Sequence, residues 1–308
     1  MLRRLTVGIT TRNRADSLNR CLRSLRLLDG LSPEILVFDD GSSPPVVETI
    51  ITHVPGLRVL RDETGPGHTA IGRNRLVRAA AASAVLLLDD DTCLLSRESV
   101  EQALAVLDGD PRIAAVAFAQ AEADGRPWPT HMQPSPVTFP CQVASFIGFA
   151  HLVRRDAFIA VGGYREDFNY IGEEKELCLR LVDTGYRIVY LPAARVSHLA
   201  DPGGRDQARS LRFAVRNDCL TALYNDPLPR VLWTAPARYL LYFRLRHAGG
   251  VRDPWGWLWI ARELISRSKA IAAQRRPVAR ATLHAWRELK RSPPYSPPAS
   301  SSVGNDAA

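Results

Sequence analysis

The sequence predicts an α/β protein whose mostly parallel sheet is covered by helices on both faces. Two observations lead to this prediction. Short apolar runs alternate with amphipathic helical segments from Leu5 to Ala119, and this alternation is typical of parallel βαβ units. The chain has 308 residues, of which 46% are apolar and 23% are charged. That composition is ordinary for a globular protein with one large core or two smaller ones.

The elements of the first half follow from their periodicity. Apolar runs bounded by turn formers predict strands at residues 5–10, 34–38, 57–60, 85–88 and 113–119. Helical spacing predicts helices between them, at residues 16–28, 46–52, 69–82 and 98–107. In the first of these helices, the apolar side chains share one face: Leu18, Cys21, Leu22, Leu25 and Leu28. That face is expected to pack on the sheet.

Polar clusters follow three of the predicted strands. They are Thr10-Thr11-Arg12-Asn13, Asp39-Asp40-Gly41-Ser42 and Asp89-Asp90-Asp91. In sheets of this kind, ligands bind beyond the C-terminal ends of the strands. Three adjacent carboxylates repel one another unless a cation compensates them, and hard divalent cations prefer oxygen ligands. A solvated turn or a helix N-cap would also explain the aspartates.

The second half has a different composition. Residues 120–145 contain five prolines and predict a long loop over the site, and residues beyond 205 are helical in pattern. Residues 205–291 contain 18 Lys and Arg and 6 Asp and Glu, which gives a net charge of +12. Trp255, Trp257 and Trp259 lie in an amphipathic segment there, which predicts either an interfacial membrane helix or a packed helical subdomain. Residues 292–308 are rich in Pro, Ser and Ala, so a disordered tail is expected.

Other features of the sequence bear on its location. The five cysteines form no CxxC pair, which favours reduced thiols in a cytoplasmic setting. No apolar leader precedes the first strand, and no run of about 18 apolar residues occurs, so neither secretion nor a membrane span is expected. We expect a cytoplasmic protein that attaches peripherally to an anionic membrane surface through its basic third.

Taken together, the segments resemble an inverting family 2 glycosyltransferase with the GT-A fold. The resemblance covers roughly residues 4–225 and rests on short segments in the right order and spacing. These are Val7 to Arg14, Val37 to Ser43, Gly72-Arg73-Asn74, Leu87 to Thr92, Val161 to Tyr164, Gly172 to Arg180 and Ala194 to His198. The resemblance implies a nucleotide-diphosphate sugar donor and a glycan, lipid-linked or polymer acceptor, as in cell-envelope polysaccharide synthesis. No nucleic acid is expected as a partner.

The resemblance and the change in composition together divide the chain into three parts. Residues 1–204 would form the GT-A domain that binds the nucleotide sugar and catalyses transfer, with acceptor elements at about 120–204. Residues 205–291 would form the basic helical region, and residues 292–308 the tail. Trp128 and His131 in the proline-rich loop are candidates for stacking on an acceptor sugar, whereas His151 and Arg180 fit packing roles equally well.

The resemblance also assigns the donor site. Thr10 and Arg12 would meet the nucleotide, and Asp40 would contact its base, with Asp39 as neighbour; a turn cap is the alternative for both aspartates. Arg73 would hold the diphosphate, unless it lies on a solvated helix face. Residues Asp89 to Asp91 match the DxD motif, in which Asp91 would bind Mg²⁺ or Mn²⁺ and Asp89 would support it. Asp90 should matter least.

Two further positions carry the chemistry in this family. His198 matches a late histidine that completes the metal shell, although a histidine at a strand end is an alternative. Glu173-Glu174 stands where the family has Glu-Asp, whose second acid is the general base. Because residue 174 is Glu rather than Asp, either glutamate could act, and Glu174 is favoured. Both lie in the first turn of a helix, which is favourable for anions.

Two other functions compete with sugar transfer. A nucleotidyltransferase also uses an α/β sheet, but it usually carries a Gly-rich loop after the first strand, where this chain has Thr10-Thr11-Arg12-Asn13. A basic, non-catalytic protein that binds membrane or nucleic acid would explain the arginines, yet no nucleic-acid-binding motif appears.

Overall fold

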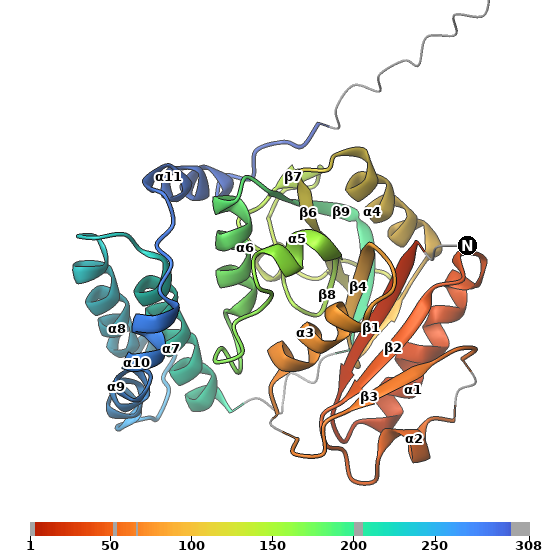
Figure 1. The fold of residues 1–308 in the computed structure, drawn as a ribbon, viewed down its shortest axis with the longest axis horizontal. Helices are drawn as coiled ribbons and strands as arrows, with labels where there is room; N and C mark the ends of the chain where they lie inside the picture. Colours follow the sequence, from red (N-terminus) through yellow and green to blue (C-terminus); the bar gives the residue numbers. More distant parts are fainter. Residues whose placement is uncertain (1–3, 52–53, 66, 200–205, 297–308) are drawn as a thin grey trace, which may run out of the picture.

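The computed structural model describes residues 4–51, 54–65, 67–199 and 206–296. Among these residues one sheet forms the centre of the molecule (Figure 1). Its strands are β1 (Leu5–Thr11), β2 (Glu34–Asp39), β3 (Arg58–Arg61), β4 (Ala84–Asp89), β5 (Thr92–Leu94), β6 (Ile113–Ala121), β7 (Cys141–Gln142), β8 (Ala150–Arg154) and β9 (Arg187–His198). The α-helices are α1 (Ala15–Ser24), α2 (Val46–Thr49), α3 (Thr69–Ala79), α4 (Arg97–Gly109), α5 (Arg155–Ala160), α6 (Glu173–Asp183), α7 (Gln207–Asn225), α8 (Val231–Ala248), α9 (Gly256–Ser266), α10 (Ser268–Gln274) and α11 (Arg280–Leu289). Two 3₁₀ segments, η1 (Leu25–Leu31) and η2 (Thr130–Met132), complete the described elements.

The strand order brings the predicted polar clusters together. The described strands run in the order β3-β2-β1-β4-β8-β6-β9-β5, and β7 pairs with β9. Strands β3, β2, β1 and β4 are parallel neighbours, so their carboxyl ends meet at one edge. In this register Thr10 of β1 lies between Phe38 of β2 and Asp89 of β4.

Both faces of the sheet are buried, which explains the continuous apolar runs of its strands. In β4, Leu86 and Leu88 pack into the core on the side of α1 and α4, whereas Val85 and Leu87 face the core on the side of α3 and α6. All apolar side chains on the predicted face of the first helix, from Leu18 to Leu28, are buried. The predicted fold class is confirmed.

The structure differs from the prediction in the second half of the sheet. Strand β8 is inserted antiparallel between β4 and β6, and β5 and β7 pair antiparallel with β9. The sheet is therefore mixed beyond β4. These strands are short or irregular, as β9 is, with Pro192 inside it and a register shift opposite Phe118 and Ala119. Their sequences therefore lack the clear periodicity of the first half.

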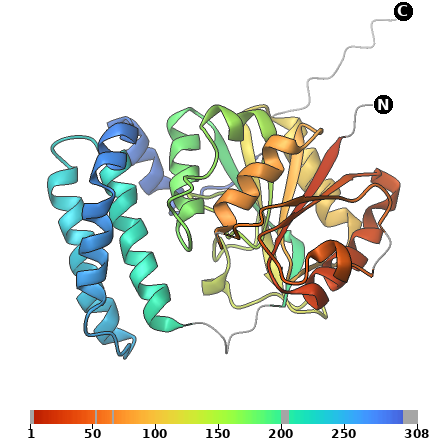
Figure 2. The same ribbon diagram turned by 60° about the horizontal axis from the view of Figure 1, so that its bottom comes forward.

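The basic region forms a bundle of helices beside the sheet domain, visible in both ribbon views (Figures 1 and 2). Trp257 and Trp259 pack against a small core around Tyr242 and Ile260, whereas Trp255 remains 67% exposed. Packing, rather than an interfacial helix, therefore accounts for two of the three tryptophans. In the part of the chain that the structure describes, no helix combines the length and apolar character that crossing a bilayer requires.

The expectation of a disordered tail is wrong for its first residues. Tyr295 is 8% exposed and donates its backbone N–H to Pro140, and the backbone N–H of Gln142 donates to Pro293. Residues 297–308 of the expected tail lie outside the described residues, as do residues 200–205 around the expected domain boundary.

Candidate active site

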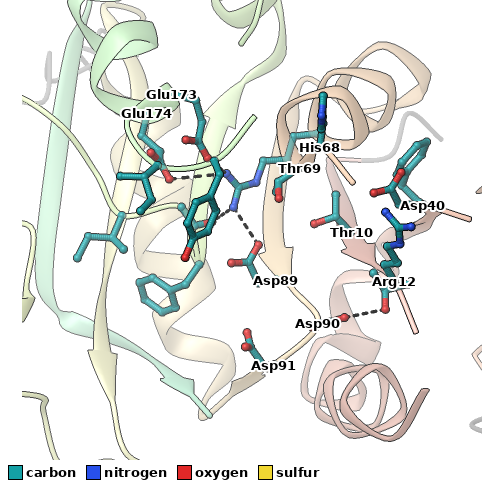
Figure 3. A pocket seen from close by; sticks show the side chains of 18 of the residues that line it. Thr10, Arg12, Asp40, His68, Thr69, Asp89, Asp90, Asp91, Glu173 and Glu174 are labelled. Atoms are coloured by element: carbon teal, nitrogen blue, oxygen red, sulfur yellow. Dashed lines mark hydrogen bonds and ion pairs between the residues drawn. The ribbon is translucent and has the colours of Figure 1, made fainter. Parts of the chain in front are cut away.

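A cavity of about 570 Å³ opens at the carboxyl ends of β1, β2 and β4. Every residue predicted for the donor, metal and catalytic sites except Asp39 lines it: Thr10, Arg12, Asp40, Arg73, Asp89, Asp90, Asp91, Glu173, Glu174 and His198. In Figure 3, Asp40 and Arg12 lie on one side of the cavity, Glu173 and Glu174 on the other, and the aspartate triplet between them. Residues more than 160 positions apart in sequence therefore share one site.

The two aspartates that end β2 have different surroundings. Asp39 is fully buried; it accepts from the backbone N–H groups of Ser42 (2.8 Å) and Val46 (3.2 Å) and pairs with Arg61. It therefore holds the turn outside the cavity, as the alternative prediction had it. Asp40 lines the cavity, and its Oδ1 is buried without a hydrogen-bond partner. Burial raises the pKa of Asp40 even though Arg12 opposes it, so this oxygen is well suited to accept from a ligand N–H.

The members of the triplet also differ. Asp90 is 3% exposed, accepts from Thr11 Oγ1 (2.7 Å) and pairs with Arg14 (2.8 Å). Burial raises the pKa of Asp90 to about 7. Asp90 is therefore the most deeply embedded of the three, which does not fit the expectation that its removal matters least. Asp89 instead accepts from Arg73 (2.9 Å).

Asp91 lies beside His198 at the floor of the cavity. Its Oδ1 is buried without a hydrogen-bond partner and is 3.6 Å from His198 Nε2, and its Oδ2 pairs with Arg14 (3.0 Å). The other ring nitrogen of His198 contacts Gln120 Oε1 (2.6 Å), and the His198 ring is stacked between Trp128 and Phe149. The ring is thus held by neighbours on both faces, as in metal-binding histidines whose orientation is fixed by a second hydrogen bond.

The composition of the cavity wall suits a divalent cation. Six carboxylates line it (Asp40, Asp89, Asp90, Asp91, Glu173 and Glu174), but only three guanidinium groups (Arg12, Arg14 and Arg73). The described residues contain no cluster of three or more metal-ligating side chains. Asp91 and His198 offer two ligands, and Mg²⁺ or Mn²⁺ commonly completes its shell with water and substrate phosphates. The residues present therefore fit such a cation bound together with a diphosphate.

Arg73 connects the triplet to the glutamates. It is 3% exposed, and its guanidinium donates to Asp89 (2.9 Å) and Gly148 O (2.7 Å) while lying 3.4 Å from Glu173 and 3.7 Å from Glu174. This burial excludes the solvated helix face. Burial lowers the pKa of Arg73, but these carboxylates outweigh it and keep the group charged. A guanidinium with this many protein partners positions carboxylates and has limited freedom to hold a diphosphate.

The glutamate pair begins α6 directly after Gly172, whose φ of 94° is in the left-handed region. Burial, together with the charge of Glu174, raises the pKa of Glu173 to about 8. Burial also raises the pKa of Glu174, against the effect of Arg73. The side chain of Glu174 is 17% exposed and that of Glu173 only 7%. Glu174 is therefore the more accessible of two carboxyls whose proton affinity is suited to acid–base chemistry near neutral pH.

Helix α7 is hydrogen-bonded to the loop that precedes these glutamates. The amide of Asn217, which is 1% exposed, donates to Tyr170 O (2.9 Å) and Ile171 O (2.6 Å). Its neighbour Arg216 is fully buried and donates to Asp167 O (2.9 Å). Ile171 has a φ of 62°, which is strained for a β-branched residue and must be stabilised by its surroundings. The helical region thus contributes directly to the shape of the cavity.

Several lining residues were not predicted. Arg14 pairs with both Asp90 and Asp91, and its position directly after the first strand-end cluster was the available signal. Residues 146–149, 170 and 171 also line the cavity, but no motif marks them, whereas Gly172 begins a segment that carries the resemblance. His68 also lines it, in the Gly-rich stretch before α3.

The remaining candidates lie outside the cavity lining. His151 is fully buried, contacts Tyr164 Oη (2.8 Å) and stacks on Phe146. Arg180 donates to Glu176 (2.7 Å), so both residues have packing roles. His131 is exposed, and Trp128 stacks on His198 with ring centroids 5.3 Å apart.

The fold and the site define an α/β protein with a carboxylate-lined cavity at the carboxyl ends of its parallel strands. Comparison with known families places the chain: residues 6–162, just over half of it, match the glycosyl transferase family 2 model. The chain belongs to this family and is a glycosyltransferase with the GT-A fold. This membership decides against the nucleotidyltransferase and against a purely non-catalytic protein.

Curated relatives are mycobacterial. The pre-mycofactocin glycosyltransferase of Mycobacterium tuberculosis is 31% identical over 210 residues, which cover 64% of this chain and 43% of that protein. The chain therefore spans less than half the length of this relative. The N-acetylglucosaminyl-diphospho-decaprenol L-rhamnosyltransferase of the same species is 26% identical over 279 residues, covering 77% of this chain and 89% of that protein.

Solved structures share the fold. The mannosyltransferase PcManGT from Pyrobaculum calidifontis, in complex with GDP-Man and Mn²⁺, has a TM-score of 0.59 at 18% identity. The match covers 94% of this chain and 83% of the PcManGT chain. Residues 1–349 of S. aureus TarS, in complex with UDP-GlcNAc, have a TM-score of 0.61 at 16% identity and cover 93% and 88%. At this identity the likeness shows the fold alone.

Proposed function

We propose that this glycosyltransferase moves a hexosyl group from a nucleotide-diphosphate sugar to an acceptor hydroxyl, with inversion at the anomeric carbon and dependence on a divalent metal. The observation that carries the proposal is the order of groups across one cavity. An unpartnered carboxylate, Asp40, lies at one side, the aspartate triplet in the middle, and the glutamate pair opposite. A nucleotide base, a diphosphate and a reacting sugar follow one another in the same order.

The donor would bind at the strand ends. Asp40 Oδ1 would accept from an N–H of the base, which would also remove the cost of leaving that oxygen unpaired. Thr10 and Arg12 line the same side of the cavity and would meet the nucleotide. Asp39 would act through the turn it holds rather than by contact.

Asp91 and His198 would hold the metal, with Asp89 in support. When bound, Mg²⁺ or Mn²⁺ supplies Lewis-acid neutralisation of the diphosphate leaving group. The excess of carboxylates over guanidinium groups in the cavity supports this role, because an anionic donor would otherwise meet net repulsion.

Glu174 would act as the general base. It would take the proton from an acceptor hydroxyl, whose oxygen forms a bond to the anomeric carbon while the bond from that carbon to the diphosphate oxygen breaks. A single displacement of this kind inverts the configuration. Arg73, in contact with Asp89 and near both glutamates, would fix the carboxylates on the acceptor side.

The acceptor would be a glycan or a lipid-linked saccharide of the cell envelope, at the cytoplasmic face of a membrane. Support comes from the relative whose name specifies a diphospho-decaprenol acceptor, which matches along 89% of its own length. Attachment would be peripheral, through the basic helical region. Trp128 and His131 stay candidates for acceptor contact.

Ligand-dependent stability tests the donor site. Nucleoside diphosphates with Mn²⁺ should raise the melting temperature of the protein, because binding to the native state alone stabilises it in proportion to affinity. Asp91→Asn should abolish the Mn²⁺-dependent part of this shift and retain the metal-independent part. Asp40→Asn should weaken binding of the nucleotide with and without Mn²⁺. A shift in Asp91→Asn that responds to Mn²⁺ as the wild type does would remove Asp91 from the metal site.

A further inference from the structure

The outer face of α8 is apolar where a surface helix normally is polar. Leu232, Trp233, Leu240 and Phe243 are 67%, 56%, 60% and 41% exposed, and Pro236 lies between them in sequence. Positions 233, 236, 240 and 243 recur at helical spacing and Leu232 lies beside them, so the five residues form one stripe. Both ribbon views place α8 at the margin of the molecule, on the side away from the parallel strands (Figures 1 and 2). Nothing in the described chain covers this stripe.

A groove continues the stripe at the N-terminal end of α8. It has a volume of about 340 Å³ and lies between α8 and α11. Leu228, Trp233 and Leu283 supply its apolar wall, so Trp233 belongs to both the stripe and the groove.

The same groove has cationic walls. Arg280, His284 and Arg287 line it from one face of α11, at helical spacing, and Arg230 lines it from the start of α8. Arg230 has an acidic partner in Asp226 (3.4 Å). Arg280 and Arg287 have no acidic partner among the described residues, although most acidic side chains of the helical region are paired with arginines. The groove therefore combines an apolar wall with uncompensated positive charge.

We propose that this face, the α8 stripe with the α8–α11 groove, binds an anionic lipid bilayer. The stripe would enter the boundary between headgroups and acyl chains, and the groove would take a lipid phosphate between Arg280 and Arg287. The apolar stripe, the tryptophan at its end and the adjacent arginines together match the features by which interfacial helices bind anionic membranes. This assigns a surface to the proposed membrane attachment and relies on no step of sugar transfer.

Charge complementarity favours a bilayer over a second copy of the chain. Residues 205–291 carry a net charge of +12, so two copies meeting through this face would bring like charges together. An anionic lipid surface would attract the same residues over roughly a Debye length, about 8 Å at physiological ionic strength.

Vesicle co-sedimentation tests the proposal with the full chain and without any sugar donor. The protein should sediment with phosphatidylcholine vesicles that contain phosphatidylglycerol, and much less with phosphatidylcholine alone or at high salt. Arg280→Glu together with Arg287→Glu should lower the partition coefficient at least about tenfold, because each arginine near an anionic surface contributes about 1 kcal/mol. Leu240→Asp should weaken binding to the vesicles, and low salt should not restore that binding.

Matched substitutions at the other end of the molecule serve as controls. Ile51 is 80% exposed and Arg26 is exposed, and both lie in the sheet domain. Ile51→Asp and Arg26→Glu should sediment like the wild type. Vesicles of brominated lipid should quench tryptophan fluorescence, and Trp233→Phe should reduce that quenching.

Three outcomes would overturn the proposal. The first is a wild-type protein that stays in the supernatant at low salt. The second is unchanged binding by the double arginine variant. The third is a dimer in solution that Leu240→Asp converts to a monomer, because the stripe would then be an interface between copies. The variants of the stripe and the groove should still transfer sugar to a water-soluble acceptor. Absence of that activity in the wild-type protein would count against the proposed sugar transfer, and not against the membrane surface.

Discussion

The sheet domain and the helical region use buried arginine in opposite ways. At the sheet edge, Arg73 is surrounded by more carboxylates than it can neutralise, since Asp89, Glu173 and Glu174 all lie within 4 Å of it. In the helical region, the buried Asp253 forms an ion pair with Arg212, and the fully buried Arg216 forms one with Glu263 (3.0 Å). Most acidic groups there are paired with arginines, and the arginines without an acidic partner lie at the surface. One region therefore has an excess of negative charge inside a cavity, and the other an excess of positive charge outside.

This contrast indicates what each region binds. Uncompensated carboxylates in a cavity are costly unless they are protonated or meet a cation. Surface arginines without an acidic partner cost little free energy, because water solvates them, and they remain available to an anionic partner. The two regions meet along α6 and α7, where Glu176 and Asn217 make their contacts. The following predictions test the separation between catalysis in the first region and support from the second.

Glu174→Gln should have the largest effect. It removes the proposed base while retaining size and hydrogen bonding, so kcat should fall by about 10²–10⁴ fold, the usual contribution of general acid–base catalysis. The affinity for the nucleotide sugar, measured by thermal shift, should change little. Glu173→Gln is the matched control, with a smaller loss. A larger loss in Glu173→Gln than in Glu174→Gln would exchange the two roles.

Glu176→Gln should have the largest effect on stability. Glu176 is fully buried and accepts from Arg165 (2.8 Å), Arg180 (2.7 Å) and Asn225 of α7 (3.1 Å). Removing one partner of a buried ion pair costs about 3–5 kcal/mol, because charges are left uncompensated. Chemical denaturation should show this loss in the free energy of unfolding. A loss below about 1 kcal/mol would mean that the buried ion pairs of Glu176 contribute little net stability.

The stability that Glu176 provides should also depend on pH in a defined direction. Burial alone would raise the pKa of Glu176, but Arg180 and Arg165 outweigh it and lower the pKa below the ordinary 4.5. A carboxyl with a lowered folded-state pKa stabilises the protein above its unfolded-state pKa and loses this effect as the pH falls through the folded-state value. The difference between wild type and Glu176→Gln should therefore shrink below about pH 4.5.

Asn217→Ala tests whether the helical region supports catalysis. The substitution removes the donors to Tyr170 O and Ile171 O, so the strained turn before Glu173 should relax. We expect kcat to fall about tenfold or more, because small displacements of reacting groups are costly, while the KM for the donor changes less. Asp218→Asn is the control, since Asp218 pairs with Lys175 (2.6 Å) and Arg238 but not with the loop carbonyls. Equal losses in both variants would indicate a general effect of α7.

The sequence predicted the first region better than the second for a physical reason. Parallel strands buried on both faces have continuous apolar runs, and their ends carry the ligand groups, so Asp40 and Asp91 could be located from the strand pattern. Glu174, which lies in the first turn of α6, was located through the family resemblance. The antiparallel strands β5, β7 and β8 are too short for their sequences to show a reliable apolar periodicity. Arg14 was missed because its two carboxylate partners are 76 and 77 positions away, a contact that only the fold creates.

The pH dependence of transfer should give the smallest but most specific effect. Glu174 must be deprotonated to act as a base, and burial raises its pKa above the ordinary 4.5. Activity should therefore be lost as the pH falls, along a limb that lies above pH 4.5. Because the neighbouring Glu173 carboxyl, whose pKa is raised to about 8, shares the site, the two protons belong to the pair. Below its raised pKa the Glu173 carboxyl is protonated, and its hydrogen bond lowers the pKa of Glu174. Glu173→Gln keeps a hydrogen-bond donor at this position, so the limb should stay near its wild-type pH, whereas Glu173→Ala removes the donor and should move the limb to higher pH. A kcat profile whose limb stays in place or moves to lower pH in Glu173→Ala would show that another group controls it.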